Sequence, residues 1–378
     1  MKVPEMIPAE YAWRVDRARA SMAREACDLM ILDSGESLAW ISGYTVSETM
    51  YRAVFLPREG APWFVLRELD EAPCREGGWI SDVAGYPDMA SPEKFMIEEL
   101  RRRGFAEASI GVDHNSISFN PARADEFAAA LPNARFVNLM GATDSLRWVK
   151  SAHEIAQIAS AAAIADSAMA QVAAAARPGF TTREAAAIAA AAFLREGADT
   201  GETGPIVRGS GSHEFLHGLF RTDELGAGDI LHVELIPRVA HYGARIMRPI
   251  LIGAPTERQE EVASQLIRLQ DAQIADMKPG AVASDVDRIV RQGVLDAGLR
   301  AEYANVTAYM LGLYIRTPRS SDFSRVFLPD QHWPLEENMV FHVYTTAEGL
   351  GFSETVVVTP DGGRRLTRTP RRLLLAGG

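Results

Sequence analysis

The chain has 378 residues, of which 47% are hydrophobic and 24% are charged, and its formal net charge is −11 at pH 7. This length favours two domains, and the composition is that of an ordinary globular protein, which excludes global disorder. The acidic balance, 50 Asp and Glu against 39 Lys and Arg, opposes phosphate backbones and anionic lipids. We therefore expect neither nucleic acid nor a membrane surface as a partner.

Targeting signals and cysteines also limit the possibilities. No stretch approaches 18 uncharged apolar residues, and residues 1–10 lack the pattern of an export signal. Cys27 and Cys74 are the two cysteines, too few for a disulfide framework or a thiolate metal site. These features predict a soluble cytoplasmic protein. A basic run at residues 364–372 is expected to be a solvated tail.

The first 147 residues alternate between helical and strand-like patterns. Apolar residues at helical spacing predict helices at 8–25, 92–103 and 120–130. Short apolar runs predict strands at 29–32, 53–56, 63–66, 109–112 and 134–137. Such alternation predicts an α/β domain over residues 1–147.

The pattern changes at residue 148, where we place the domain boundary. A long Ala-rich helix is expected at 151–176. Strand-like segments follow at 229–235, 248–253, 339–344 and 354–359. Residues 148–378 therefore form a predicted α+β domain in which helices cover a curved antiparallel sheet.

A weak internal repeat runs through this second domain. The turn Arg177-Pro178-Gly179 and the helix pattern after it recur from Lys278-Pro279-Gly280, at a constant offset of 101 residues (178 to 279). Each copy reads as a turn followed by a helix with an acidic residue in its first turn. The repeat predicts a duplicated half-domain with a site enclosed between the halves.

Several motifs together resemble the creatinase, aminopeptidase P and prolidase family. They are Trp148-Val149-Lys150-Ser151-Ala152-His153-Glu154-Ile155, the two Pro-Gly helix starts, Gly228-Asp229-Ile230-Leu231 and the closing stretch 353–362. Residues 28–32 and 38–44 are similar to the N-terminal domain of that family. The resemblance implies a pita-bread catalytic domain after a smaller α/β domain. It also implies a homodimer whose N-terminal domains lean over the partner's active site.

Most of this family binds two divalent metals through two Asp, one His and two Glu. At the matching positions this sequence has Glu234, Arg245, Tyr309, Tyr344 and Ser353, with Glu354 one residue beyond. A guanidinium has no lone pair to donate and carries a fixed positive charge where a cation would sit. We therefore expect neither metal nor cofactor, and the chain is most similar to the metal-free branch that resembles ectoine hydrolase and creatinase.

The resemblance places His217 where the family keeps an active-site histidine. An imidazole can take a proton from water and return it to a leaving nitrogen, so His217 is the expected general base and then acid. His213 is the competing candidate. Glu234 could orient His217 or bind a substrate cation. Arg245 is either the structural partner of Glu234 or the group that binds a carboxylate or oxyanion.

Further residues complete the predicted site. Tyr309 and Tyr344 could donate phenolic hydrogen bonds to the oxyanion, although buried tyrosines also serve packing alone. Glu354 could bind a cationic nitrogen of the substrate or be a solvated carboxylate. By analogy with the family, the partner subunit would close the pocket, and His241 and His342 are expected to be structural. The residues expected to close it are Tyr44, Tyr51 and Arg52.

The leading hypothesis is a metal-independent hydrolase. Its substrate would be a small polar nitrogen-containing carboxylate with an amide, cyclic amidine or guanidino C–N bond. One alternative is a metal-dependent Xaa-Pro dipeptidase or lyase with an unorthodox ligand set. Another is a catalytically inactive small-molecule binding protein, since so many ligand positions differ.

Overall fold

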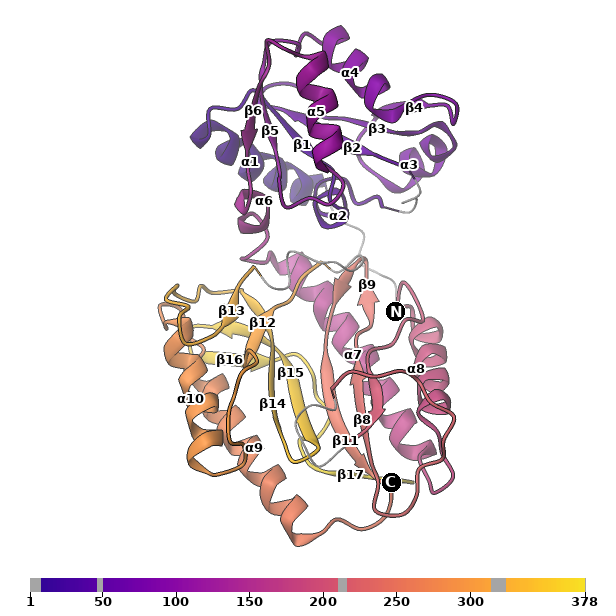
Figure 1. Cartoon of the computed structure of the whole chain (residues 1–378), viewed down its shortest axis with the longest axis vertical. Coiled ribbons are helices and arrows are strands. Elements are labelled where there is room, and N and C mark those ends of the chain that lie inside the picture. The colour runs from indigo at the N-terminus through magenta and orange to yellow at the C-terminus, as the bar shows by residue number, and fades with distance from the viewer. Residues whose placement is uncertain (1–7, 46–49, 210–215, 314–323, 378) are drawn as a thin grey trace. The chain divides into compact units, whose positions relative to one another are not determined.

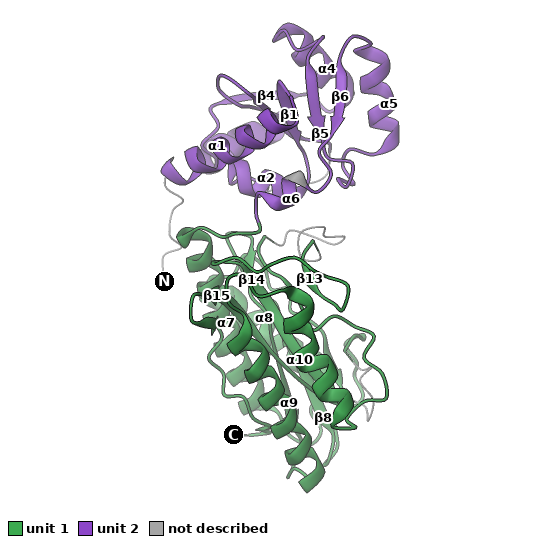
Figure 2. Cartoon of the chain, turned by 90° about the vertical axis from the view of Figure 1, so that its left-hand side faces the viewer, with its two compact units in different colours: residues 1–4, 148–314, 321–378 green, residues 5–147, 315–320 purple. Residues whose placement is uncertain are grey.

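The computed structural model describes residues 8–45, 50–209, 216–313 and 324–377 (Figure 1). These residues form two compact units, an N-terminal unit of residues 8–147 and a C-terminal unit of residues 148–377 (Figure 2). The division falls between Arg147 and Trp148. Each unit has its own sheet and its own hydrophobic core.

The N-terminal unit is a mixed six-stranded sheet in the order β4-β3-β2-β1-β5-β6. Its strands are β1 (Leu29–Leu32), β2 (Ala53–Pro57), β3 (Trp63–Arg67), β4 (Asp82–Tyr86), β5 (Ser109–Val112) and β6 (Arg135–Asn138). Its helices are α1 (Pro8–Arg24), α2 (Gly35–Ser42), α3 (Glu71–Gly77), α4 (Pro92–Arg102), α5 (Pro121–Ala130) and α6 (Ala142–Ser145). The expected α/β architecture is confirmed, although the short elements α2, α3, α6 and β4 were not predicted.

Helix starts in this unit follow from their capping residues. Ser91 accepts a hydrogen bond from the backbone N–H of Lys94, and Asn120 accepts one from that of Arg123. In both helices a proline follows the cap, where a missing N–H costs nothing. These local signals explain why α4 and α5 begin within one residue of their predicted starts.

The C-terminal unit is a nine-stranded sheet with the path β13-β12-β14-β15-β11-β8-β7, to which β16 and β17 pair at β15 and β11. Its main strands are β7 (Ile206–Arg208), β8 (Ile230–Leu235), β11 (Ile246–Leu251), β12 (Ala308–Met310), β13 (Val326–Phe327), β14 (Val340–Ala347) and β15 (Leu350–Thr359). The remaining strands are β9 (Arg238–Val239), β10 (Tyr242–Gly243), β16 (Gly362–Arg365) and β17 (Leu374–Leu375). Four helices pack on the sheet, namely α7 (Ala152–Ala175), α8 (Thr182–Glu196), α9 (Glu257–Asp276) and α10 (Ala283–Asp296) (Figure 1).

This unit is a duplicated half-domain, as the repeat predicted. Helices α7 and α8 precede β7, β8 and β11, and helices α9 and α10 precede β12, β14 and β15. Capping boxes start α7 at Ser151, α8 at Thr181 and α9 at Thr256. The two halves join where β11 pairs with β15 through Met247 and Ser353.

The basic run at residues 364–372 is held on the unit and is not a tail, which corrects that part of the expectation, whereas four of its five arginines are solvent-exposed as expected. Strand β16 pairs with β15, and β17 pairs with β11. The Arg371 side chain is 12% exposed and forms an ion pair with Asp271. Arg248, which is fully buried, donates hydrogen bonds to the carbonyl oxygens of Thr369 and Pro370. Pairing with distant strands therefore holds this segment on the unit.

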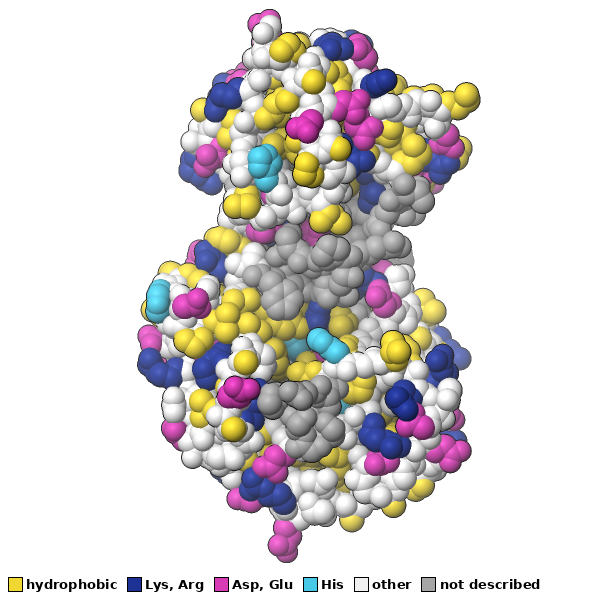
Figure 3. Space-filling model, viewed as in Figure 1, with side chains coloured by type: hydrophobic (Ala, Val, Ile, Leu, Met, Phe, Trp, Pro, Cys, Tyr) yellow, Lys and Arg dark blue, Asp and Glu magenta, His cyan; other side chains and the backbone are white. Residues whose placement is uncertain are grey.

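One helix in the described part of the chain, α7, is long and apolar enough to cross a membrane by length and composition. Half of its most apolar window is buried, and α7 packs against α8 and the sheet. A core helix has these same properties. On the face seen in Figure 3, acidic and basic side chains are interspersed over both units.

Candidate active site

The alternation of side chains along the strands brings most of the predicted site residues together. Ser353 on β15 is paired with Tyr344 on β14 and with Met247 on β11, and Met247 is paired with Glu234 on β8. Paired residues of neighbouring strands point to the same side of a sheet. Glu234, Tyr344 and Ser353 therefore share one face of the central sheet. Tyr309, paired with His342 two residues before Tyr344, shares it as well.

Arg245 lies at the centre of this face. Its Nη1 donates a hydrogen bond to the Tyr309 hydroxyl at 2.6 Å and lies 3.5 Å from Glu234 Oε1. The backbone of Arg245 is fixed because its N–H donates to Thr355 Oγ1 and its carbonyl accepts from the same hydroxyl, both at 2.8 Å. Arg245 and Glu234 are 7% and 2% exposed. The guanidinium is thus held nearer to the phenol than to the carboxylate.

The metal pair that the resemblance implies does not fit these residues. The five matching positions offer the carboxylate of Glu234, the hydroxyls of Tyr309, Tyr344 and Ser353, and the guanidinium of Arg245. Divalent metals in such sites need several carboxylate or imidazole ligands. Among the described residues no group of three or more His, Cys, Asp or Glu side chains is placed to hold a metal ion. A fixed cation is instead built into the face itself.

A second tyrosine, Tyr344, lies beside Tyr309 on the same face as the guanidinium. The rings of Tyr309 and Tyr344 lie 6.0 Å apart in an edge-to-face arrangement. Burial raises the pKa of Tyr344 above its ordinary value, so its phenol keeps its proton at neutral pH. The face therefore combines one carboxylate with three groups that can donate to a negatively charged oxygen.

Two histidines share this face, and their place there was not predicted. His232 lies two residues before Glu234 on β8, and His342 lies two residues before Tyr344 on β14. Strand period alone could have indicated both positions. The His342 ring lies 4.9 Å from that of Tyr309, and neither of its nitrogens has a hydrogen-bond partner among the described residues. His342, expected to be structural, therefore borders the site directly.

Both histidines are held neutral. Burial, with a smaller effect of His217, lowers the pKa of His232 to about 3. Burial, with a smaller effect of Arg245, lowers the pKa of His342 well below its ordinary value. These rings enter the folded state without a proton that the unfolded chain binds below about pH 6.5.

We predict acid sensitivity from these two rings. Because the unfolded chain binds more protons, the free energy of unfolding falls as the pH drops from about 6.5 toward 3, by up to about 1.4 kcal/mol per pH unit for each ring. Asp33, whose burial raises its pKa to about 6, acts in the opposite direction. The measurement therefore compares two proteins. The free energy of unfolding, obtained from urea unfolding at several pH values, should depend less steeply on pH in His342→Phe than in the wild type. An exposed control, His332→Phe, should leave the slope unchanged, and an unchanged slope in His342→Phe would contradict the prediction.

His217 is exposed and follows residues 210–215, which lie outside the described residues together with the competing candidate His213. Its neighbour Gly218 lies against the side chain of Val207, which is paired with His232 on β8. The chain next to His217 therefore runs beside the strand that carries His232 and Glu234. Its role as general base stays a prediction.

Glu354 is not on this face, which corrects its expected role. It is paired with Val343 and points to the helix-covered side, opposite to Ser353. The carboxylate is 0% exposed, accepts a hydrogen bond from Arg248 Nη2 at 2.6 Å and accepts another from the Thr367 hydroxyl. A shift of one residue along a strand reverses the side chain. Glu354 is therefore a structural residue rather than a substrate ligand.

The residues expected to close the pocket belong to the N-terminal unit. Tyr44 and Tyr51 are 3% and 6% exposed, and the Tyr51 hydroxyl donates to Asp33 at 3.0 Å. Their side chains pack inside their own unit, which corrects the expectation that they reach into a partner's site. Arg52 is half-buried, and its role stays a prediction. His241, in the turn between β9 and β10, donates its backbone N–H to Asp199 Oδ2 at 2.7 Å.

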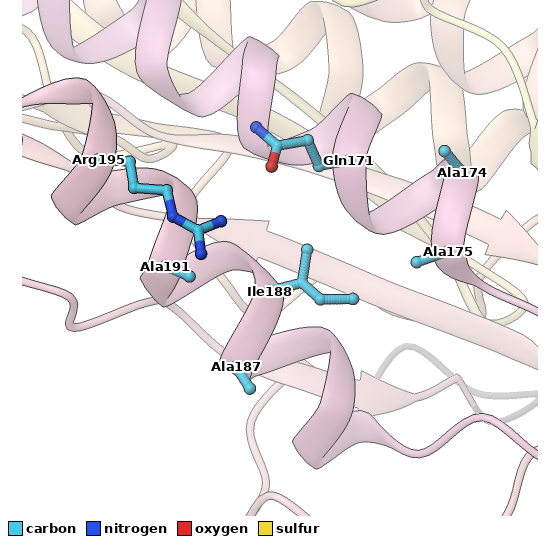
Figure 4. A pocket seen from close by; sticks show the side chains of 7 residues that line it. All are labelled: Gln171, Ala174, Ala175, Ala187, Ile188, Ala191 and Arg195. Carbon is cyan, nitrogen blue, oxygen red and sulfur yellow. The ribbon is translucent and has the colours of Figure 1, made fainter.

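A groove lies between α7 and α8 (Figure 4). It is lined by Gln171, Ala174, Ala175, Ala187, Ile188, Ala191 and Arg195. Its described lining residues include no carboxylate or imidazole. Acid–base chemistry is therefore expected on the sheet face and not in this groove.

Comparison with known proteins covers both units. Residues 156–360 match the model of metallopeptidase family M24, and residues 14–149 match that of the creatinase/prolidase N-terminal domain. An uncharacterized hydrolase/peptidase of Sinorhizobium fredii is 27% identical over 99% of this chain and 98% of its own length. The Xaa-Pro dipeptidase of Pyrococcus furiosus is 28% identical over 61% of this chain and 66% of its own. The crystal structure of dipeptidase PepE from Mycobacterium ulcerans matches with a TM-score of 0.81 and 25% identity, over 99% of this chain and all of the other.

Proposed function

Because this chain belongs to metallopeptidase family M24, we propose that it is a hydrolase of a carbon–nitrogen bond that works without a metal ion. The family resemblance is confirmed, and metal independence is the further step that we propose. The observation that supports metal independence is the position of Arg245. Its guanidinium lies 2.6 Å from the Tyr309 hydroxyl, and the family pattern expects a metal ligand at residue 245. The proposed substrate is a small nitrogen-containing carboxylate with an amide, cyclic amidine or guanidino group.

The chemistry follows from the groups on the face. His217 would take a proton from water as the water oxygen attacks the substrate carbon, and would pass that proton to the nitrogen as the C–N bond breaks. Arg245, Tyr309 and Tyr344 would stabilise the negative oxygen that forms during the attack. Glu234 would orient His217 or hold a cationic nitrogen. The substrate carboxylate, or that oxygen, would bind at Arg245.

A second candidate is an Xaa-Pro dipeptidase. Relatives named Xaa-Pro dipeptidase, such as the Pyrococcus furiosus protein, support a peptide substrate for this chain. This function would need a metal site from residues other than the five matching positions. The homodimer implied by the resemblance, the small-molecule partner and the cytoplasmic location expected from the sequence also remain predictions.

Metal analysis separates the two candidates. We expect protein purified without added metal to contain no stoichiometric manganese, iron, cobalt or zinc, and its turnover to be unaffected by a chelator. The substrate panel would contain N-acyl amino acids, ectoine-like and creatine-like carboxylates and Xaa-Pro dipeptides, with His217→Ala as the inactive control. Stoichiometric metal, together with peptide hydrolysis that a chelator abolishes and manganese restores, would overturn metal independence and establish the dipeptidase.

A third possibility, a binding protein without catalysis, gives a different result in the same panel. In that case ligands would bind without turnover, and His217→Ala would leave the cellular role intact. Loss of that role in His217→Ala would exclude it.

A further inference from the structure

The hydroxyl of Tyr344 is oriented by a residue outside the strands. Asn305, in the connection between α10 and β12, donates a hydrogen bond from Nδ2 to the Tyr344 oxygen at 3.2 Å. Arg300 Nη2 donates to Asn305 Oδ1 at 3.0 Å. These three residues form the Arg300–Asn305–Tyr344 relay.

The orientation of the Asn305 amide is fixed from both ends. Its oxygen faces a guanidinium, which can only donate hydrogen bonds. Its nitrogen also donates to the carbonyl oxygen of Val306 at 3.2 Å, and a carbonyl can only accept. Turning the amide over would bring donors against a donor and acceptors against an acceptor. Asn305 therefore presents an N–H to Tyr344, never an acceptor.

This polarity has a direct consequence for Tyr344. Its oxygen accepts from Asn305, so its own proton must be donated to some other group. None of the hydrogen bonds among the described residues uses this proton. Tyr344 is on the site face and is paired with Ser353 on the neighbouring strand. The charges of Glu234 and Arg245 act on its hydroxyl. The proton is therefore available to a molecule bound on that face.

Arg300 supplies an independent observation. It is 7% exposed, and no carboxylate of the described residues lies within ion-pair distance of it. Its guanidinium is held by the Glu302 carbonyl oxygen at 3.1 Å and by the face of the Tyr303 ring at 4.0 Å. Burying a cation without a carboxylate partner lowers the stability of the fold. This cost indicates that Arg300 has a role other than stability. Through Asn305 its charge polarises the Tyr344 hydroxyl.

We infer that Arg300 and Asn305 are positioning residues that hold Tyr344 as a hydrogen-bond donor to a negatively charged oxygen of the substrate. The inference rests on the proposed hydrolase function and deepens it. It assigns to the substrate a carboxylate, or an oxygen that becomes negative during attack, next to Tyr344. Asn305→Asp tests it, because the new carboxylate keeps the bond to Arg300 but accepts the proton that Tyr344 would otherwise donate.

The first test needs no substrate. In protein labelled with 3-fluorotyrosine, the fluorine resonance of Tyr344 is identified by its loss in Tyr344→Phe. We expect it to move saturably on addition of N-acetylglycine, which carries a carboxylate and an amide. In Asn305→Asp the resonance should be displaced before any addition and should then fail to respond. A response equal to that of the wild type, or none in the wild type, would overturn the inference.

The second test uses the substrate found in the panel. Asn305→Asp and Tyr344→Phe should each lower kcat by about 10-fold with a smaller change in KM. The double variant should be no slower than Tyr344→Phe alone, and multiplied losses would contradict the relay. Tyr11→Phe is the matched control, because Tyr11 is 7% exposed like Tyr344 but belongs to the N-terminal unit, and it should retain kcat.

Two safeguards keep the outcomes distinct. If Asn305→Asp does not fold, as judged by thermal unfolding, Asn305→Ala replaces it with the same expected non-additivity. If no substrate is turned over, the proposed function fails while the fluorine measurement still decides the relay. If a substrate is hydrolysed but Tyr344 responds equally in Asn305→Asp, the relay is wrong and the proposed function stands.

Discussion

Arg248→Met is expected to lower the free energy of unfolding by about 3–5 kcal/mol, because it leaves the buried charge of Glu354 without its main partner. The two side chains are 0% exposed and joined at 2.6 Å. Arg248 also donates to the carbonyl oxygens of Ser353, Thr369 and Pro370. Urea unfolding followed by tryptophan fluorescence measures the loss.

An exposed arginine provides the control. Arg258 has two carboxylate partners, Glu261 and Glu348, but its side chain is 50% exposed. Arg258→Met should cost less than about 1 kcal/mol, since solvent screens exposed pairs. Combining Arg248→Met with Glu354→Leu should recover part of the loss, because no buried charge then remains unpaired. Equal costs for Arg248→Met and Arg258→Met would refute the structural role of the Arg248–Glu354 pair.

Arg245→Gln is expected to reduce kcat/KM for a carboxylate substrate by about 10²–10³-fold, the usual cost of removing a charged donor from a negatively charged oxygen. If Arg245 binds the substrate carboxylate, the loss should depend on that group. The measurement therefore compares each carboxylate substrate with its neutral carboxamide. The wild type should prefer the carboxylate, and Arg245→Gln should lose that preference.

A second buried arginine controls for general disturbance of the unit. Arg238, a residue outside the predicted site, is 6% exposed and pairs with Glu202 at 2.6 Å. Arg238→Gln should keep both kcat/KM and the preference for the carboxylate. A preference that survives Arg245→Gln would show that Arg245 is only the structural partner of Glu234, the other role open from the sequence.

The parts of the fold predicted correctly are those with strong local signals. Helices α4, α5 and α7 have capping residues and apolar spacing that fix their starts, and the buried strands are uninterrupted apolar runs. The short helix α2 was missed because its apolar residues, 38–41, are consecutive and not spaced three or four apart, so they show no helical period. The basic run near residue 370 was expected to be a tail, because charge composition predicts solvent exposure but does not show pairing with strands far away in the sequence.

The site residues likewise divide into those that the sequence predicted and those that it did not. Family motifs gave the positions of Glu234, Arg245 and Tyr344, which the strands then place on one face. Glu354 was placed wrongly, although its spacing of one residue from Ser353 already put it on the opposite side. Asn305 gave no signal of this kind. It lies in an irregular connection, and its role depends on contacts with Arg300 and Tyr344 that no periodicity encodes.

The duplication divides the chemistry of the site between its two copies. The first copy supplies the charged pair, Glu234 and Arg245, and the second supplies the phenols Tyr309 and Tyr344. Each ancestral copy could thus diverge separately, one toward charge and one toward neutral hydrogen-bond donors, while their common architecture was retained. In evolutionary terms, a new substrate can be accommodated by changing one copy while the other keeps its contribution.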